Sequence, residues 1–288
     1  MGKKARLRRE REDAELAEVE ADSTGQLGFQ LKMDRARLHL TNLDLAVQKW
    51  LEVHADLVRE ETDPETGDDL IVVEAPAVAP ADVISLIAAD CIHNLRASLD
   101  QLVFSLSWAY TAGPLSKQVA ESCEFPIYGP REPTPRELGK RIGAVHPDAQ
   151  TIIKDLQPHL AGDAFASEKL WILDQLWNLD KHRMLPVTVF GQEAVAINPQ
   201  ALMPTESSAT YRVGGPIRRK TEIVRFAGKR PDAYPNPMSA AVLNIAFGQG
   251  TPAYGHPVTG FLAGLADYLR DDVIGKLTPF LEGGTALG

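Results

Sequence analysis

The strongest constraint on the fold is a run of apolar residues between positions 80 and 110 that repeats with the period of an α-helix. The residues that recur at intervals of three or four are Ile84, Ala88, Cys91, Leu95, Leu99, Leu102 and Leu106. Such spacing puts all of them on one helical face. Pro80 suits a first helical turn, and the stretch 111–114 contains the glycine and proline that end a helix. The sequence therefore predicts a long helix over 80–110 with one face in the core.

The remaining elements follow from the same kind of pattern. Further helices are predicted over 28–60, 136–142, 147–156, 168–182 and 258–275. Strands are predicted over 70–73, 187–190, 194–197, 209–213, 217–226 and 239–247, with 187–197 forming a hairpin. The order of helices, then strands, then a closing helix favours an α+β fold over an alternating α/β fold. We expect packed long helices, a small antiparallel sheet and a C-terminal helix.

The charged N-terminus is set apart from the rest of the chain. Basic residues crowd the first eleven positions and acidic residues dominate from Glu10 to Glu20. This composition predicts a solvated, disordered arm over 1–25. A nucleic-acid-binding arm is the alternative, but the acidic half would neutralise much of the attraction. Residues 26–288 are predicted to form a single α+β domain, helical over about 28–183 and sheet-containing over about 184–288.

Bulk properties limit the compartment and the class of protein. The 288 residues carry a net charge of -9, which favours solubility and disfavours non-specific binding to nucleic acid. The two cysteines, Cys91 and Cys123, cannot form a disulfide scaffold and fit a reducing compartment. There is no secretory signal and no apolar stretch of about 18 residues. We therefore expect a cytoplasmic protein with no membrane partner.

One group of polar residues stands out on the helix predicted over 80–110. At 100° per residue, His93, Arg96 and Asp100 fall within about 60° of one another. Arg96 and Asp100 are four residues apart, which lets their side chains meet. The face they share borders apolar residues, so we expect another part of the chain to cover it. A covered polar trio needs partners, because unpaired burial is costly.

A second polar group lies on the helix predicted over 168–182. Asp174, Asn178, Lys181 and His182 share one face of this helix. Four ionisable residues, Asp180-Lys181-His182-Arg183, follow one another where the helix gives way to Pro186. Cations at that point suit the negative end of the helix dipole.

Two interpretations of the combined cluster remain open. In the first, His93, His182, Asp100 and Asp180 are catalytic acid–base and orienting groups, while Arg96, Lys181 and Arg183 bind phosphate. In the second, the same residues form a salt-bridge lock between two helices. A metal site is not predicted, because the spacing matches no metal motif and the sequence has no HExxH. No cofactor is expected.

Four segments of the chain resemble a family of uncharacterised bacterial proteins. They are His93-Asn-Leu-Arg-x-x-Leu-Asp-x-Leu102, Phe125-Pro-Ile127, Gln157-Pro158, and Leu173-x-x-Leu-x-x-x-Asp-Lys-His-Arg183. Together they span about 90–185, and their fixed order makes the resemblance fairly specific. The resemblance implies no established activity.

A looser likeness is to HEPN-type helical domains, many of which are metal-independent RNases or nucleotide binders. Their hallmark is an arginine followed four to six residues later by a histidine on a late helix. Asp180-Lys181-His182-Arg183 departs from that order, and the literal match Arg141-x-x-x-x-His146 precedes Pro147. The likeness implies a nucleotide- or RNA-phosphate-binding protein, including the possibility of an RNase. The alternative is a non-enzymatic interaction or structural protein, with a homo-oligomer among the expected assemblies.

Overall fold

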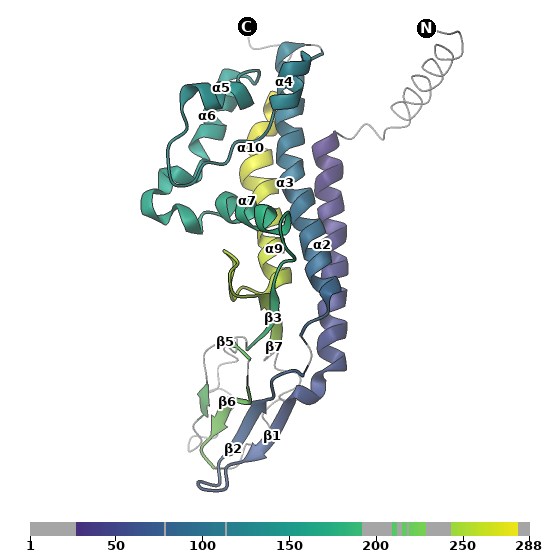
Figure 1. The fold of residues 1–288 in the computed structure, drawn as a ribbon, viewed down its shortest axis with the longest axis vertical. Helices are drawn as coiled ribbons and strands as arrows, with labels where there is room; N and C mark the ends of the chain where they lie inside the picture. Colours follow the sequence, from purple (N-terminus) through teal and green to yellow (C-terminus); the bar gives the residue numbers. More distant parts are fainter. Residues whose placement is uncertain are drawn as a thin grey trace, which may run out of the picture.

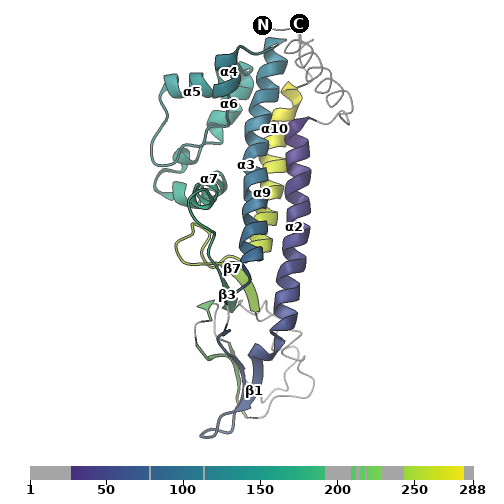
Figure 2. The same cartoon turned by 45° about the vertical axis from the view of Figure 1, so that its right-hand side comes forward.

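The fold is an elongated α+β structure in which three helical segments run side by side as a column. The computed structural model describes residues 27–77, 79–112, 114–191, 209–211, 215–217, 219–228 and 243–281. The column consists of α2 (Gly28–Val53), α3 (Asp82–Thr111) and the C-terminal segment that begins with α9 (Val258–Tyr268) (Figures 1 and 2). Two small sheets lie at one end of it, where α2 ends and α3 begins. The predicted α+β class is confirmed.

Helix α3 forms the centre of the core. All seven apolar residues that predicted it, from Ile84 to Leu106, are at most 1% exposed. Full burial of one large aliphatic side chain contributes about 1.5–3 kcal/mol, so this face stabilises the column strongly. Burial also raises the pKa of the Cys91 thiol to about 12. Cys91 therefore acts as a small apolar side chain of the core rather than as a nucleophile.

Helix α2 packs along α3 but is shorter than predicted. Its buried side includes Phe29, Leu43 and Trp50. The helix ends at Val53, where the His54 ring stacks on Trp50 with ring centroids 4.0 Å apart. The prediction that it continues to residue 60 is wrong, because Val58–Thr62 forms strand β1 instead. This stretch pairs with β2 as a strand instead of adding a further helical turn.

Five short helical segments lie against the side of the column that carries Arg96 and Asp100. They are α4 (Lys117–Ser122), α5 (Pro135–Ile142), α6 (Pro147–Asp155), η2 (Pro158–Ser167) and α7 (Lys169–Asp180). The predicted helices at 136–142, 147–156 and 168–182 are confirmed as α5, α6 and α7. Thr134 and Glu137 form a capping box that starts α5.

The strands form two antiparallel sheets rather than the single sheet predicted. The first has the order β1 (Val58–Thr62), β2 (Asp69–Val73), β6 (Thr221–Phe226), β4 (Ala209–Tyr211). The second has the order β5 (Gly215–Pro216), β3 (Val187–Gly191), β7 (Leu243–Phe247). The predicted hairpin partner 194–197 lies outside the described residues. Because β1 and β2 come from the chain before residue 184, the first sheet joins segments far apart in the sequence.

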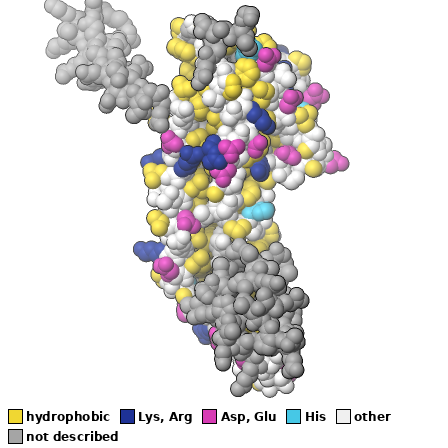
Figure 3. Space-filling view, turned by 180° about the vertical axis from the view of Figure 1, so that it is seen from behind, with side chains coloured by type: hydrophobic (Ala, Val, Ile, Leu, Met, Phe, Trp, Pro, Cys, Tyr) yellow, Lys and Arg dark blue, Asp and Glu magenta, His cyan; other side chains and the backbone are white. Residues whose placement is uncertain are grey.

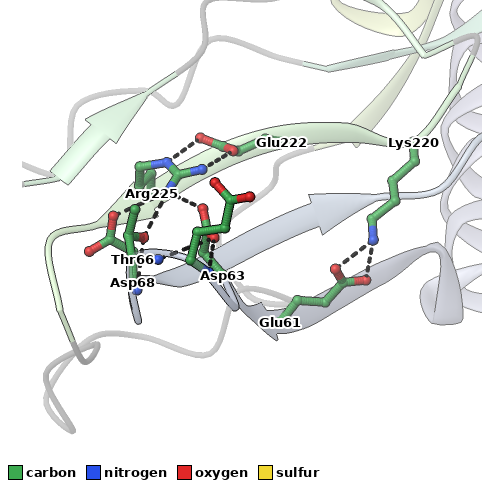
Figure 4. Close-up of polar contacts among 8 residues, drawn as sticks. Glu61, Asp63, Thr66, Asp68, Lys220, Glu222 and Arg225 are labelled. Atoms are coloured by element: carbon green, nitrogen blue, oxygen red, sulfur yellow. Dashed lines mark hydrogen bonds and ion pairs between the residues drawn. The ribbon is translucent and has the colours of Figure 1, made fainter.

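Arg225 on β6 forms ion pairs that connect the β1–β2 turn to the rest of the first sheet (Figure 4). Its guanidinium forms ion pairs of 2.7 Å with Asp63, 3.1 Å with Asp68 and 2.8 Å with Glu222. The bond from Arg225 is the largest cause of the lowered pKa of the Asp63 carboxyl. These side chains are partly exposed, so the ion pairs fix the geometry of the turn more than they add to stability.

The C-terminal helical segment completes the column. Helix α9 continues through a π-helical turn at Leu269–Ile274, then α10 (Gly275–Leu277) and η4 (Thr278–Phe280). Leu262, Leu265, Leu269 and Val273 face inward, each at most 1% exposed. The predicted charged arm at 1–25 lies outside the described residues. Among the helices that the structure describes, none combines the length and the apolar character needed to cross a membrane.

Candidate functional site

Arg96 lies at the centre of the polar cluster, buried between α3 and the chain segment that follows α4. Its side chain is 5% exposed and forms an ion pair with Asp100, one helical turn further along α3. Its Nη2 donates to the carbonyl of Phe125 over 3.1 Å. The backbone N–H of Phe125 in turn donates to Asp100 over 3.0 Å. Both backbone groups of Phe125 are thus satisfied by one Arg–Asp pair, as buried backbone groups require.

Helix α7 closes the other side of Arg96. The Asp174 carboxylate lies 3.6 Å from Arg96 Nε. The Trp177 ring lies beneath the guanidinium, 5.2 Å from its centroid to Cζ, which is a cation–π distance. Burial raises the pKa of Asp174, while the nearby Arg96 acts in the opposite direction. Asn178 donates to Asp174 over 2.9 Å. Arg96 therefore connects α3, the Phe125 segment and α7.

Gln157, just before η2, holds the far end of the same segment. Its amide NH₂ donates to the carbonyls of Pro126 and Ile153, each over 2.9 Å. Its Oε1 accepts from the backbone N–H of Tyr128 over 3.0 Å. Gln157 is only 3% exposed, so its two bonds to the carbonyls are buried, while its bond to the Tyr128 N–H is partly buried. The stretch from Phe125 to Tyr128 is thus fixed at both ends by side chains.

Three of the predicted site residues belong to a different environment at the junction of α3 and α7. His93 is exposed on α3, and Asp180 is the half-buried last residue of α7. The pKa of Asp180 is raised by burial and by the neighbouring Asp90, and His93 opposes this rise. The carboxylate and the imidazole therefore lie close enough to influence each other. His182 is exposed in the turn that follows α7.

The two predicted phosphate-binding residues of this turn are also exposed. The Lys181 ammonium lies over the Trp177 ring, 2.9 Å from its centroid. The backbone N–H groups of His182 and Arg183 both donate to the carbonyl of Leu179, over 3.1 and 3.0 Å, which ends the helix as a tight turn. We call His93, Asp180, Lys181, His182 and Arg183 the junction residues.

The structure therefore divides the predicted cluster into two groups. Arg96 and Asp100 belong to a closed network with Asp174, which we call the Arg96 lock. The five junction residues stay accessible or half-buried beside it. Among the described residues, no three histidine, cysteine or acidic side chains are grouped as metal ligands would be.

Three groups that contact Arg96 or fix the Phe125–Tyr128 stretch were not identified as site residues from the sequence. They are the backbone of Phe125, the Gln157 amide and the Asp174 carboxylate. Phe125 and Gln157 fall in two of the four segments that carry the family resemblance, and that was the available signal. Asp174 lies four residues before Asn178 on a helix face already predicted to be polar. Its partner could not be identified without the packing angle of α7.

Comparison of the chain with models of known protein families, with curated proteins and with solved structures gives no match.

Proposed function

We propose that this is a non-enzymatic interaction protein in which the Arg96 lock joins two helices and the Phe125 segment. The observation that carries the proposal is the burial of the Arg96 guanidinium, with Asp100, Asp174 and the Phe125 carbonyl around it. A phosphate group could reach Arg96 only by displacing these protein acceptors. The lock is therefore better suited to fixing the geometry of the fold than to binding a substrate.

The interaction surface in this proposal is the outer side of α2. Leu31, Leu38 and Leu45 are spaced seven residues apart there and are 48%, 48% and 59% exposed. Seen from behind, hydrophobic side chains reach the surface along the helical column (Figure 3). Leucines repeated at one heptad position supply part of the apolar seam by which helices associate. It lies opposite the buried side of α2, so it does not contribute to the core.

The partner that fits this row is a second, antiparallel copy of the chain. Arg37 and Asp44 flank the row on the same side, seven residues apart. An antiparallel copy places each Arg37 opposite the partner's Asp44, which is favourable. A parallel copy would instead bring Asp34 against the same aspartate of its partner. Charge complementarity thus selects the antiparallel arrangement.

Leu38→Glu is expected to convert a dimer into a monomer without unfolding the chain. The side chain is half exposed in the isolated chain, so a charge costs little there, but it would be desolvated between two copies. Light scattering after size-exclusion chromatography gives the mass of both proteins. Thr151→Glu, at an exposed threonine on α6 and away from α2, is the control and should leave the mass unchanged. A monomeric wild type over the micromolar range would reject the self-association proposal.

A second candidate function is phosphate binding, to RNA or a nucleotide, by the junction residues. It is supported by the exposure of Lys181, His182 and Arg183 in one turn, with His93 and Asp180 beside them. Cations and imidazoles at a surface are the groups that contact a phosphate backbone. As the likeness to HEPN-type domains implied, such a site would act without a metal.

Combined replacement of Lys181 and Arg183 by alanine tests this second candidate. If it is correct, wild type binds short single-stranded RNA at low salt, and the affinity of the double variant is lower by a factor of about ten or more. Fluorescence anisotropy over a salt series measures both. Lys154→Ala, an exposed cation on α6, should leave affinity unchanged. Cleavage of the RNA by wild type but not by a folded His182→Ala variant would make the site catalytic, whereas absence of binding at low salt would reject the candidate.

A further inference from the structure

A pocket of about 470 Å³ lies between α4, α5 and the segment that leads from Phe125 to Arg131. It is separate from the junction residues and from the outer side of α2. Its volume lies within the range of small-molecule sites, about 300–1,000 Å³. The residues that line it are Glu121, Ser122, Glu124, Tyr128, Arg131, Glu137, Lys140 and Arg141.

The three cationic side chains of this pocket differ in whether a carboxylate already forms an ion pair with them. Arg131 is fully paired, with two bonds of 3.0 and 2.5 Å to Glu137. Arg141 pairs with Glu124, and its guanidinium also lies 5.8 Å from the centroid of the Tyr128 ring. In the described part of the chain, no carboxylate forms an ion pair with Lys140, which is exposed at the pocket. Lys140 is therefore free to receive an anion.

The surroundings of Arg141 also favour an incoming anion. Its pKa is lowered, first by burial and then by the neighbouring Arg96, although Asp100 and Asp174 oppose the change. A partly desolvated guanidinium beside a second one is stabilised by a negative charge, which Glu124 supplies in this structure and which an incoming anion would supply after displacing Glu124. Because Arg96 is closed off by the lock, the pocket side of Arg141 is where such a charge can enter.

We propose that this pocket binds a mononucleotide, with the phosphate on Lys140 and Arg141 and the base against Tyr128. Arginine and lysine form charge-assisted hydrogen bonds to phosphate oxygens. Aromatic side chains stack unpaired bases. A carboxylate beside such a site accepts hydrogen bonds from ribose hydroxyls, a role that Glu124 fills once the phosphate has taken its place on Arg141. The pocket thus carries the three kinds of group that a nucleotide needs.

The lining also distinguishes a nucleotide from a simple anion. Arg131 and Thr134 lower the pKa of Glu137 to about 2, so this carboxylate is charged at neutral pH. Three glutamates would repel a small, highly charged anion that had no compensating donor groups. A nucleotide brings hydroxyl and amino groups that bind carboxylates, together with a base for Tyr128. The pocket should therefore bind a nucleotide more tightly than inorganic phosphate.

Isothermal titration of the full chain with AMP, GMP, CMP and UMP tests the proposal, with inorganic phosphate and adenosine as separate probes. We expect saturable binding of at least one nucleotide at micromolar to low millimolar concentration. Lys140→Ala should weaken it about tenfold or more, because one charge-assisted bond is lost. Tyr128→Leu should weaken nucleotide binding but not the binding of inorganic phosphate. Arg136→Ala is the matched control, because Arg136 is exposed on the same helix but does not line the pocket.

Four results would overturn the proposal. The first is the absence of a saturable heat of binding for every nucleotide at concentrations up to about 5 mM. The second is an equal loss of affinity in Arg136→Ala and Lys140→Ala. The third is phosphate binding as tight as nucleotide binding. The fourth is loss of binding in His182→Ala while Lys140→Ala still binds, which would place the nucleotide at the junction residues.

Discussion

Arg96→Ala is expected to lower the free energy of unfolding by about 3–5 kcal/mol, the range found when one partner of a buried ion pair is removed. The variant leaves the Asp174 carboxylate buried without its cation and the Phe125 carbonyl without its donor. It also removes the guanidinium from its place over Trp177. Denaturant unfolding followed by circular dichroism measures the change. A loss below about 1 kcal/mol would show that the network is not a lock.

Two further variants separate the loss of charge pairing from the loss of packing. Arg183→Ala removes an exposed arginine and should change stability by no more than about 0.5 kcal/mol. Arg96→Met combined with Asp174→Leu replaces the pair between α3 and α7 by apolar side chains. It should be more stable than Arg96→Ala, because no unpaired charge stays buried between these helices.

The effect of Arg96→Ala should also depend on pH. Burial already raises the pKa of Asp174, and loss of Arg96 removes a charge that opposes the rise. An acid whose pKa is raised in the folded state binds a proton more tightly there than in the unfolded chain. Its folded form therefore loses stability as pH rises from the unfolded pKa, near 3.9, through the folded pKa. The difference in free energy of unfolding between wild type and Arg96→Ala should be smallest near pH 4 and should increase toward neutral pH.

Local patterns in the sequence were enough to predict the helices that form the core. The three- and four-residue spacing from Ile84 to Leu106 depends only on helical geometry, and the structure buries every member of that set. Helix α2 shows the limit of the same reasoning. The helix was predicted to continue to residue 60, but Val58–Thr62 pairs with β2, a strand predicted at 70–73 without this partner. The division of the strands into two sheets, by contrast, depends on long-range pairing such as that of β2 with β6.

The candidate site was predictable to a similar degree. The Arg96–Asp100 pair follows from a spacing of four on one helix, and the structure contains it. The polar face of α7 was also predicted, but which of its residues meets α3 depends on how the two helices cross. That crossing brings Asp174 to Arg96 and leaves Lys181 and His182 at the surface. Residues predicted to form one cluster thus lie in two places, the buried Arg96 lock and the exposed turn that follows α7.

Gln157→Leu is expected to lower the free energy of unfolding by about 2–4 kcal/mol, although leucine has a similar size and is apolar. The cost arises because the buried Pro126 carbonyl and the partly buried Tyr128 N–H lose their partners, at about 1–3 kcal/mol for each unsatisfied group. Thermal and denaturant unfolding measure the loss. Hydrogen exchange at the Tyr128 amide should accelerate by a larger factor than exchange at amides within α3. Gln118→Leu, on an exposed turn of α4, is the control and should change stability little.

The same variant connects the interior to the proposed nucleotide pocket. Gln157 sets the backbone of Tyr128, whose ring lines the pocket, whereas Gln157 itself does not line it. At a temperature where Gln157→Leu stays folded, nucleotide binding should therefore weaken even though every lining side chain is intact. If exchange at Tyr128 and nucleotide affinity both stay at wild-type values, the segment is fixed by the Arg96 lock alone. Stability, exchange and affinity changing together would instead show that Gln157 and Arg96 jointly position the pocket wall.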